Sequence, residues 1–100
     1  MTFTGPRFQL YAQEAASRTG VAYVDHYSYV VQAYEAIGET TVNTYYPIDH
    51  THTTPTGANV VAEAFVRGLL CGTSALKSHV NAAGMKAPSK FLDCGLVNSR

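Results

Sequence analysis

The sequence has no excess of charge of either sign, no long apolar run and no apolar leader. Seven Lys and Arg residues balance seven Asp and Glu residues, and neither sign forms a run. A phosphate backbone or an anionic membrane surface would require a basic patch, so we expect no nucleic-acid partner and no membrane partner. No apolar stretch approaches the ~20 residues that a membrane helix requires. Residues 1–7 lack the apolar core of a secretory signal peptide.

Cysteine is scarce, because Cys71 and Cys94 are the only two in the sequence. Their even number and the small loop between them fit a disulfide, which would contribute roughly 3 kcal/mol. Two buried free thiols are the alternative. A disulfide would indicate an oxidising compartment, and this indication conflicts with the missing signal peptide.

The composition is that of an ordinary globular protein, with 46% hydrophobic residues and seven tyrosines. One hundred residues are enough for one small domain or for part of a larger one. We therefore treat residues 1–100 as a single, partial domain.

Three helices are indicated by apolar residues at helical spacing. The first follows Gly5-Pro6 and ends at Thr19-Gly20, with Phe8, Tyr11, Ala12, Ala15 and Ala16 on one face. The second has Ser28 as a possible cap and Gly38 as its stop. The third begins with Thr54 as N-cap and Pro55 as first residue, and it ends near Cys71-Gly72.

Residues 21–24 form a short apolar run typical of a strand that is covered on both faces of a parallel sheet. Residues 39–48 fit a short strand or a loop. Residues 73–100 fit a surface tail that Cys94 would connect back to the rest of the domain. A single buried strand would leave its backbone groups without ladder partners. The sequence therefore predicts the C-terminal part of a larger α/β domain, whose remaining strands lie outside this chain.

The segment from Pro47 to His52 carries the most distinctive chemistry. Asp49 lies three residues before His52, in a predicted loop ahead of a helix start. An Asp that accepts a hydrogen bond from one ring nitrogen of His leaves the other nitrogen free to act as a base. The positive end of the following helix favours the neutral, proton-accepting ring. This spacing suits a general base for a serine nucleophile.

Other interpretations remain open for these residues. His50, His52 and Asp49 form a possible metal-ligand set. Alternatively, Asp49 is a plain turn residue, and the histidines are surface polar groups. Asp25 and His26 form a second Asp/His pair, for which we expect structural capping.

Residues 46–58 resemble the Asp-x-x-His block of the SGNH (GDSL-type) hydrolases, and within them the fungal rhamnogalacturonan acetylesterases. The likeness continues in order and spacing over residues 7–15, 20–30, 41–43 and 60–65, and it covers about residues 5–95. The resemblance implies a three-layer α/β/α (flavodoxin-like) fold with a parallel sheet, and a C-terminal disulfide between Cys71 and Cys94. It also implies a secreted, extracellular enzyme that removes acetyl groups from pectic rhamnogalacturonan, an acetylated polysaccharide.

In that family pattern Asp49 and His52 match the acid and the base of a Ser-His-Asp triad, and no metal or organic cofactor is needed. The Gly-Asp-Ser block that carries the nucleophile is absent from this sequence, as are the Gly and Asn blocks of the oxyanion hole. None of the serines at positions 17, 28, 74, 78, 89 and 99 lies in such a motif.

The match therefore covers only the C-terminal part of the family domain, and the missing N-terminal part becomes a candidate partner. We expect either an acetylesterase that needs this part, or a non-catalytic truncated fragment or binding remnant. For the isolated chain we expect negligible activity.

Overall fold

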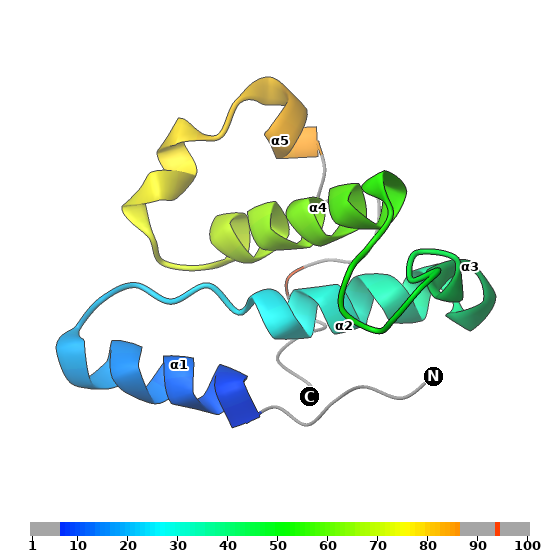
Figure 1. Cartoon of the computed structure of the whole chain (residues 1–100). Helices are drawn as coiled ribbons and strands as arrows, with labels where there is room; N and C mark the ends of the chain where they lie inside the picture. Colours follow the sequence, from blue (N-terminus) through cyan, green and yellow to red (C-terminus); the bar gives the residue numbers. More distant parts are fainter. Residues whose placement is uncertain (1–6, 87–93, 95–100) are drawn as a thin grey trace.

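The computed structural model of the protein describes residues 7–86 and Cys94. The elements are α1 (Arg7–Thr19), α2 (His26–Ile37), α3 (Glu39–Asn43), α4 (Pro55–Cys71), the 3-10 helix η1 (Ala75–His79) and α5 (Ala82–Lys86). In Figure 1, the helices of the described chain surround a central pair, with α1 below this pair and the short helices η1 and α5 above it. The central pair is α2 and α4.

The predicted α/β fold, with its three-layer arrangement and parallel sheet, is wrong, because the described residues contain helices and no strand. The apolar residues 21–24 lie in an irregular connection between α1 and α2, and Val21 is 66% exposed. Extended chain forms a sheet only where a neighbouring segment offers backbone partners, and none of the described segments does so. A short apolar run without helical periodicity therefore fits a connecting segment as well as a strand.

The predicted ends of the first and third helices are confirmed. Helix α1 ends at Thr19, and Gly20 follows with the positive φ of 74° that a glycine accommodates. Thr54 is the N-cap of α4, since its hydroxyl accepts a hydrogen bond from the Gly57 N–H at 3.2 Å. Pro55 is the first helical residue, where its missing N–H has no intrahelical partner to lose.

Helix α2 differs from its prediction at the N-terminus. Asp25 is the N-cap, because its carboxylate accepts a hydrogen bond from the Ser28 N–H at 3.2 Å, and Ser28 lies in the first turn. Gly38 ends the helix as predicted, with a φ of 100°. Residues 39–43 form the short helix α3, where the sequence indicated a strand or a loop.

The core lies between α2 and α4. Helix α2 contributes buried Tyr29, Ala33 and Tyr34, while α4 contributes buried Ala64 and Gly68. A Cβ atom added to Gly68 would lie 2.9 Å from Val24 Cγ1 and 3.2 Å from Tyr29 Cδ2. Glycine at position 68 therefore lets the two helices approach closely.

A second buried group joins α2 to the chain that follows α3. Tyr34, Val42 and Tyr45 are each about 5–6% exposed and form one hydrophobic cluster, against which Tyr46 packs. We call Tyr34, Tyr45 and Tyr46 the tyrosine cluster. Burial and the hydroxyl of Tyr46 raise the pKa of Tyr34 far above its usual range, so the Tyr34 hydroxyl stays protonated.

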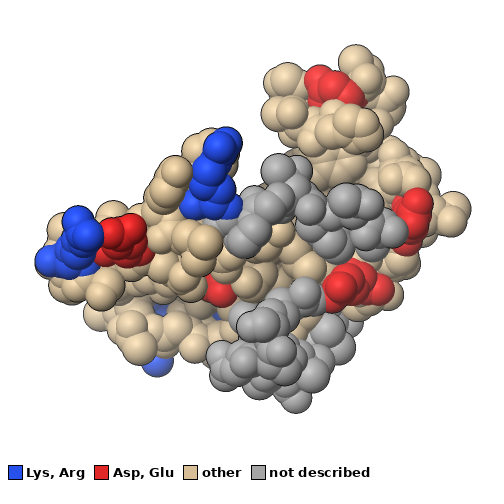
Figure 2. Space-filling model, turned by 90° about the horizontal axis from the view of Figure 1, so that it is seen from below, with Lys and Arg blue, Asp and Glu red and all other residues tan. Residues whose placement is uncertain are grey.

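Helix α1 is peripheral and has no buried residue. Gln9 connects it to the start of α2, because its Nε2 donates to Asp25 Oδ1 at 2.6 Å and to Ser28 Oγ at 2.9 Å. On the face drawn in Figure 2, the Lys and Arg side chains of the described residues lie in the left half of the view, whereas their Asp and Glu side chains occur in both halves. Among the described helices, none combines the length and the apolar character that a membrane crossing requires.

A disulfide joins Cys71, the last residue of α4, to Cys94, with their Cα atoms 5.6 Å apart. The disulfide that the resemblance implied is therefore present. The bond ties Cys94 to the central helix pair, as predicted. The rest of the predicted tail beyond Lys86 lies outside the described residues.

We predict that Gly68→Ala destabilises the protein although alanine is the better helix former. The added methyl group would overlap Val24 and the Tyr29 ring, and overpacking of this kind typically costs 1–3 kcal/mol, more than the ~1 kcal/mol gained from helix propensity. Urea unfolding measures the free energy of unfolding. The control Ala62→Gly, at an exposed position of α4, isolates the propensity effect. Equal or increased stability of Gly68→Ala would contradict close helix contact at this position.

Candidate functional site

The chain between α3 and α4 forms a loop that is closed at its base. The Thr54 N–H donates to the Tyr45 carbonyl oxygen at 2.8 Å. Tyr45 is buried in the tyrosine cluster, and Thr54 caps α4. Residues 46–53, which we call the Asp49–His52 loop, therefore start and end at residues that belong to the packed helical part of the protein.

Within the loop, Asp49 makes three short contacts. Its Oδ1 accepts hydrogen bonds from the N–H of Thr51 at 2.8 Å and from the N–H of His52 at 2.7 Å. Its Oδ2 lies 2.7 Å from Nδ1 of the His52 ring. Because Asp side chains commonly bond the backbone two or three residues ahead, the turn itself follows from the residue type. The contact to the ring is the additional feature that orients His52.

The hydrogen bonds set the charge of the pair. The His52 N–H first, then the His52 ring and the Thr51 N–H, lower the pKa of the Asp49 carboxyl below its ordinary value. An ionised Asp49 can only accept, so the Nδ1 atom of His52 carries the hydrogen in this contact. In the neutral ring the Nε2 atom then has the free lone pair. The His52 side chain is 82% exposed, which leaves the ring open to a reacting group from outside the loop.

The sequence predicted that Asp49 and His52 form a pair. The structure places Asp49 Oδ2 2.7 Å from His52 Nδ1, which is the contact that a charge relay requires. In the structure Asp49 both forms the turn and contacts the ring, so the same geometry is compatible with the turn interpretation and with the relay interpretation. The contribution of the Thr51 N–H was missed, although Asp followed by Thr two residues later is a signal for such a turn.

The other interpretations receive less support. His50 is exposed, and the described part of the chain contains no group of three His, Cys, Asp or Glu side chains placed to hold a metal ion. Asp25 caps α2, as expected. His26 Nε2 donates to the carbonyl oxygen of Val61 at 2.8 Å, and its ring meets Phe65 edge-on at 5.4 Å. This second Asp/His pair is structural.

Three of the described serines, at positions 28, 74 and 78, make hydrogen bonds within the helical part of the protein, and Ser17 lines an open hollow beside α1. Ser28 Oγ accepts from Gln9, Ser74 Oγ accepts from the Leu76 N–H at 3.2 Å, and Ser78 Oγ donates to the Ala75 carbonyl oxygen at 3.0 Å. Ser89 and Ser99 lie outside the described residues. None of these contacts involves Asp49 or His52.

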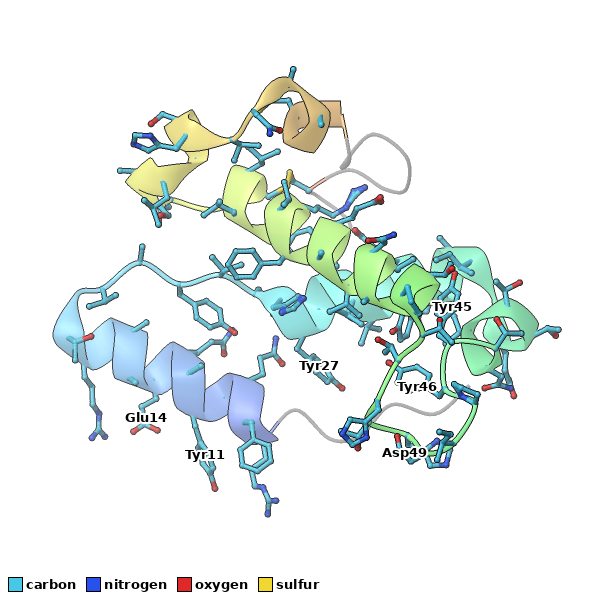
Figure 3. The ribbon with its side chains drawn as sticks, turned by 45° about the horizontal axis from the view of Figure 1, so that its top comes forward. Tyr11, Glu14, Tyr27, Tyr45, Tyr46 and Asp49 are labelled. Atoms are coloured by element: carbon cyan, nitrogen blue, oxygen red, sulfur yellow. A yellow bond between two sulfur atoms is a disulfide. The ribbon has the colours of Figure 1, made fainter. Side chains whose placement is uncertain are left out.

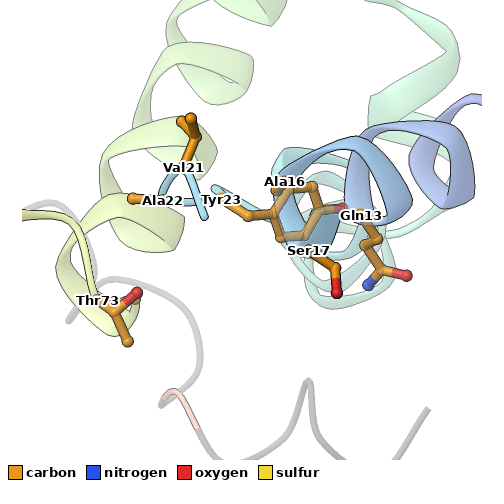
Figure 4. A pocket seen from close by; sticks show the side chains of 8 residues that line it. Gln13, Ala16, Ser17, Val21, Ala22, Tyr23 and Thr73 are labelled. Carbon is orange, nitrogen blue, oxygen red and sulfur yellow. The ribbon is translucent and has the colours of Figure 1, made fainter. Parts of the chain in front are cut away.

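An open hollow of about 390 Å³ lies between α1, the connection to α2 and the end of α4 (Figure 4). Its lining includes Gln13, Ala16, Ser17, Val21, Tyr23 and Thr73. Figure 3 shows Tyr45, Tyr46 and Asp49 together at one end of the molecule, while Tyr11 and Glu14 of α1 lie at the other. The hollow is therefore separate from the Asp49–His52 loop.

Comparison with known proteins supports the resemblance indicated by the sequence. No family model matches the chain. Over 75 residues, 75% of its length, the chain is 49% identical to a rhamnogalacturonan acetylesterase of Emericella nidulans. The predicted resemblance to these esterases is thereby confirmed. The matched part spans 31% of the length of that relative.

We predict that the Asp49 pKa depends on His52 in two separable ways. In His52→Ala the ring contact is lost, and the pKa of Asp49 rises; it stays below the ordinary value because the N–H groups of residues 51 and 52 remain. Carboxyl ¹³C chemical shifts followed over pH measure it. The hydrogen bonds that Asp49 accepts should be fully formed at a pH above the ordinary pKa of Asp. They should be lost as the pH falls through the lowered pKa of Asp49, because the carboxylate then becomes protonated.

His50→Ala is the matched control for this titration, because the charge of His50 has the smallest effect on Asp49. A rise in His50→Ala as large as that in His52→Ala would show that general charge, and not the ring contact, lowers the Asp49 pKa.

Proposed function

We propose that Asp49 and His52 are the acid and the base of a Ser-His-Asp esterase site that removes acetyl groups from pectic rhamnogalacturonan. The observation that carries this proposal is the 2.7 Å contact between Asp49 Oδ2 and His52 Nδ1, with the ring otherwise exposed. The 49% identity to a rhamnogalacturonan acetylesterase supports the acetylated polysaccharide as substrate.

In this mechanism His52 Nε2 accepts the hydroxyl proton of a serine whose oxygen attacks the acetyl carbonyl carbon. The tetrahedral intermediate expels the sugar alkoxide, which takes the proton from His52, and an acetyl-serine remains. His52 then accepts a proton from water, the resulting hydroxide attacks the acetyl-serine, and acetate leaves as the proton returns to serine. Ionised Asp49 stabilises the imidazolium formed in both halves of the reaction.

The serine of this mechanism comes from a segment outside these 100 residues, because the sequence contains no Gly-Asp-Ser block. The same absence favours a second candidate, a non-catalytic fragment or binding remnant. Both candidates give the isolated chain negligible esterase activity. The proposed location is extracellular, and the disulfide between Cys71 and Cys94 supports it.

A chimera tests the catalytic role directly. The 75 matched residues of the Emericella nidulans relative are replaced by those of this chain, and acetate release from acetylated rhamnogalacturonan is measured. We expect an active chimera in which His52→Ala and Asp49→Asn each lower kcat by about 10⁴-fold or more, since triad members act as a unit. His50→Ala should leave kcat nearly unchanged. A folded, inactive chimera, or full activity in His52→Ala, would reject the assignment.

The isolated chain is tested with p-nitrophenyl acetate. We expect no turnover above buffer, because a base and its orienting acid without a nucleophile provide little acceleration. Turnover that disappears in His52→Ala would instead show that this chain carries a competent site, and the proposal that it needs an external serine would be wrong.

A further inference from the structure

A pair of tyrosine hydroxyls links α2 to the beginning of the Asp49–His52 loop. The hydroxyl oxygens of Tyr34 and Tyr46 lie 2.7 Å apart, so one hydroxyl donates to the other. The two rings meet edge-on with their centroids 6.4 Å apart. Tyr34 is only 5% exposed, and Tyr46 is half-buried as the first residue of the loop. The contact therefore fixes one end of the loop to the central helix.

The other end of the loop is already fixed by α4. Thr54 caps that helix, and its N–H reaches back to the Tyr45 carbonyl oxygen. The first turn of α4 packs directly on the same tyrosine, since a Cβ atom on Gly57 would lie 2.7 Å from Tyr45 Cβ. The direction of the chain from Tyr45 toward Asp49 then depends on the position of Tyr46, which its hydroxyl contact with Tyr34 holds in place.

The contact between Asp49 and His52 needs this support because it is exposed. The side chains are 42% and 82% exposed, so water competes for both partners. A hydrogen bond in a buried environment is stronger than an exposed one. Holding the loop through a buried contact lowers the entropy lost when the carboxylate and the ring are brought together.

We propose that Tyr34 and Tyr46 are positioning residues, whose hydroxyl pair holds the Asp49–His52 loop in the conformation that orients the His52 ring. Neither tyrosine belongs to the acid-base pair itself. The catalytic consequence of this role rests on the proposed function, whereas the effect on the ring does not.

The first test uses the full chain and the tautomer of the neutral His52 ring, which ring ¹⁵N chemical shifts report. Asp49 holds the hydrogen on Nδ1, whereas a free ring prefers it on Nε2. Tyr34→Phe and Tyr46→Phe should each lower the ratio of Nδ1–H to Nε2–H rings by about five- to tenfold, corresponding to one net hydrogen bond. The double variant should lower it no further, because both changes remove the same contact.

Tyr45→Phe is the matched control, since it removes a hydroxyl from the same cluster and leaves the Tyr34–Tyr46 pair intact. It should keep the wild-type ratio. Circular dichroism measures whether each variant remains folded. If the buried Tyr34→Phe change unfolds the chain, the test uses Tyr46→Phe. An unchanged ratio in the single variants, or additive effects in the double variant, would overturn the proposal.

The chimera described above separates this proposal from the proposed function. In an active chimera, Tyr34→Phe should lower kcat about five- to tenfold and leave KM unchanged, because the hydroxyl pair orients the base without touching substrate. An inactive chimera together with the expected tautomer change would reject the esterase and keep the positioning role. An active chimera with unchanged kcat in both single variants would reject the positioning role and keep the esterase.

Discussion

The close approach of α2 and α4 depends on Gly68, which has no side chain. At Gly68 the backbone of α4 comes within contact distance of Tyr29 and Val24, and a methyl group there would already be too close. Because α2 is held at this distance, its next turn brings Tyr34 toward the chain that follows α3. Thr54, the N-cap of α4, donates its N–H to the carbonyl oxygen of Tyr45 in the same segment. The packing of two helices thus fixes both ends of the loop that carries Asp49 and His52.

This arrangement separates the packed part of the molecule from the exposed loop for which we propose a catalytic role. Tyr34 and Tyr45 of the tyrosine cluster are buried and Tyr46 is half-buried, so water competes less for their contacts than for those of the more exposed Asp49 and His52. An exposed pair is accessible to a substrate and to a nucleophile from elsewhere, but it is weakly held by its own attraction. Contacts with buried neighbours can hold an exposed pair in one geometry, and here a small helical frame provides them.

The helices were predictable where local signals decide them. Thr54 and Pro55 mark the start of α4, and Gly20 and Gly38 mark the ends of α1 and α2, because capping and positive φ strongly favour particular residue types. Residues 21–24 were not predictable in the same way. An apolar run of four residues becomes a strand only if partners exist, and partners are a property of the whole fold. The cap of α2 was predicted three residues too late, because Asp25 and Ser28 are both good N-caps. In the structure the Asp25 carboxylate accepts from the Ser28 N–H, and Gln9 contacts both side chains.

For the site, the sequence alone determined the residue types, their spacing and the turn. An Asp three residues before a His, ahead of a Thr-Pro helix start, gives a carboxylate that bonds the backbone N–H groups ahead of it. Only the tertiary structure decided that the same carboxylate meets the ring nitrogen of His52, that the ring faces solvent and that the loop is tied to α2 through Tyr34 and Tyr46. These contacts join residues that are distant along the chain or free to rotate, and packing, not local preference, selects one arrangement for them.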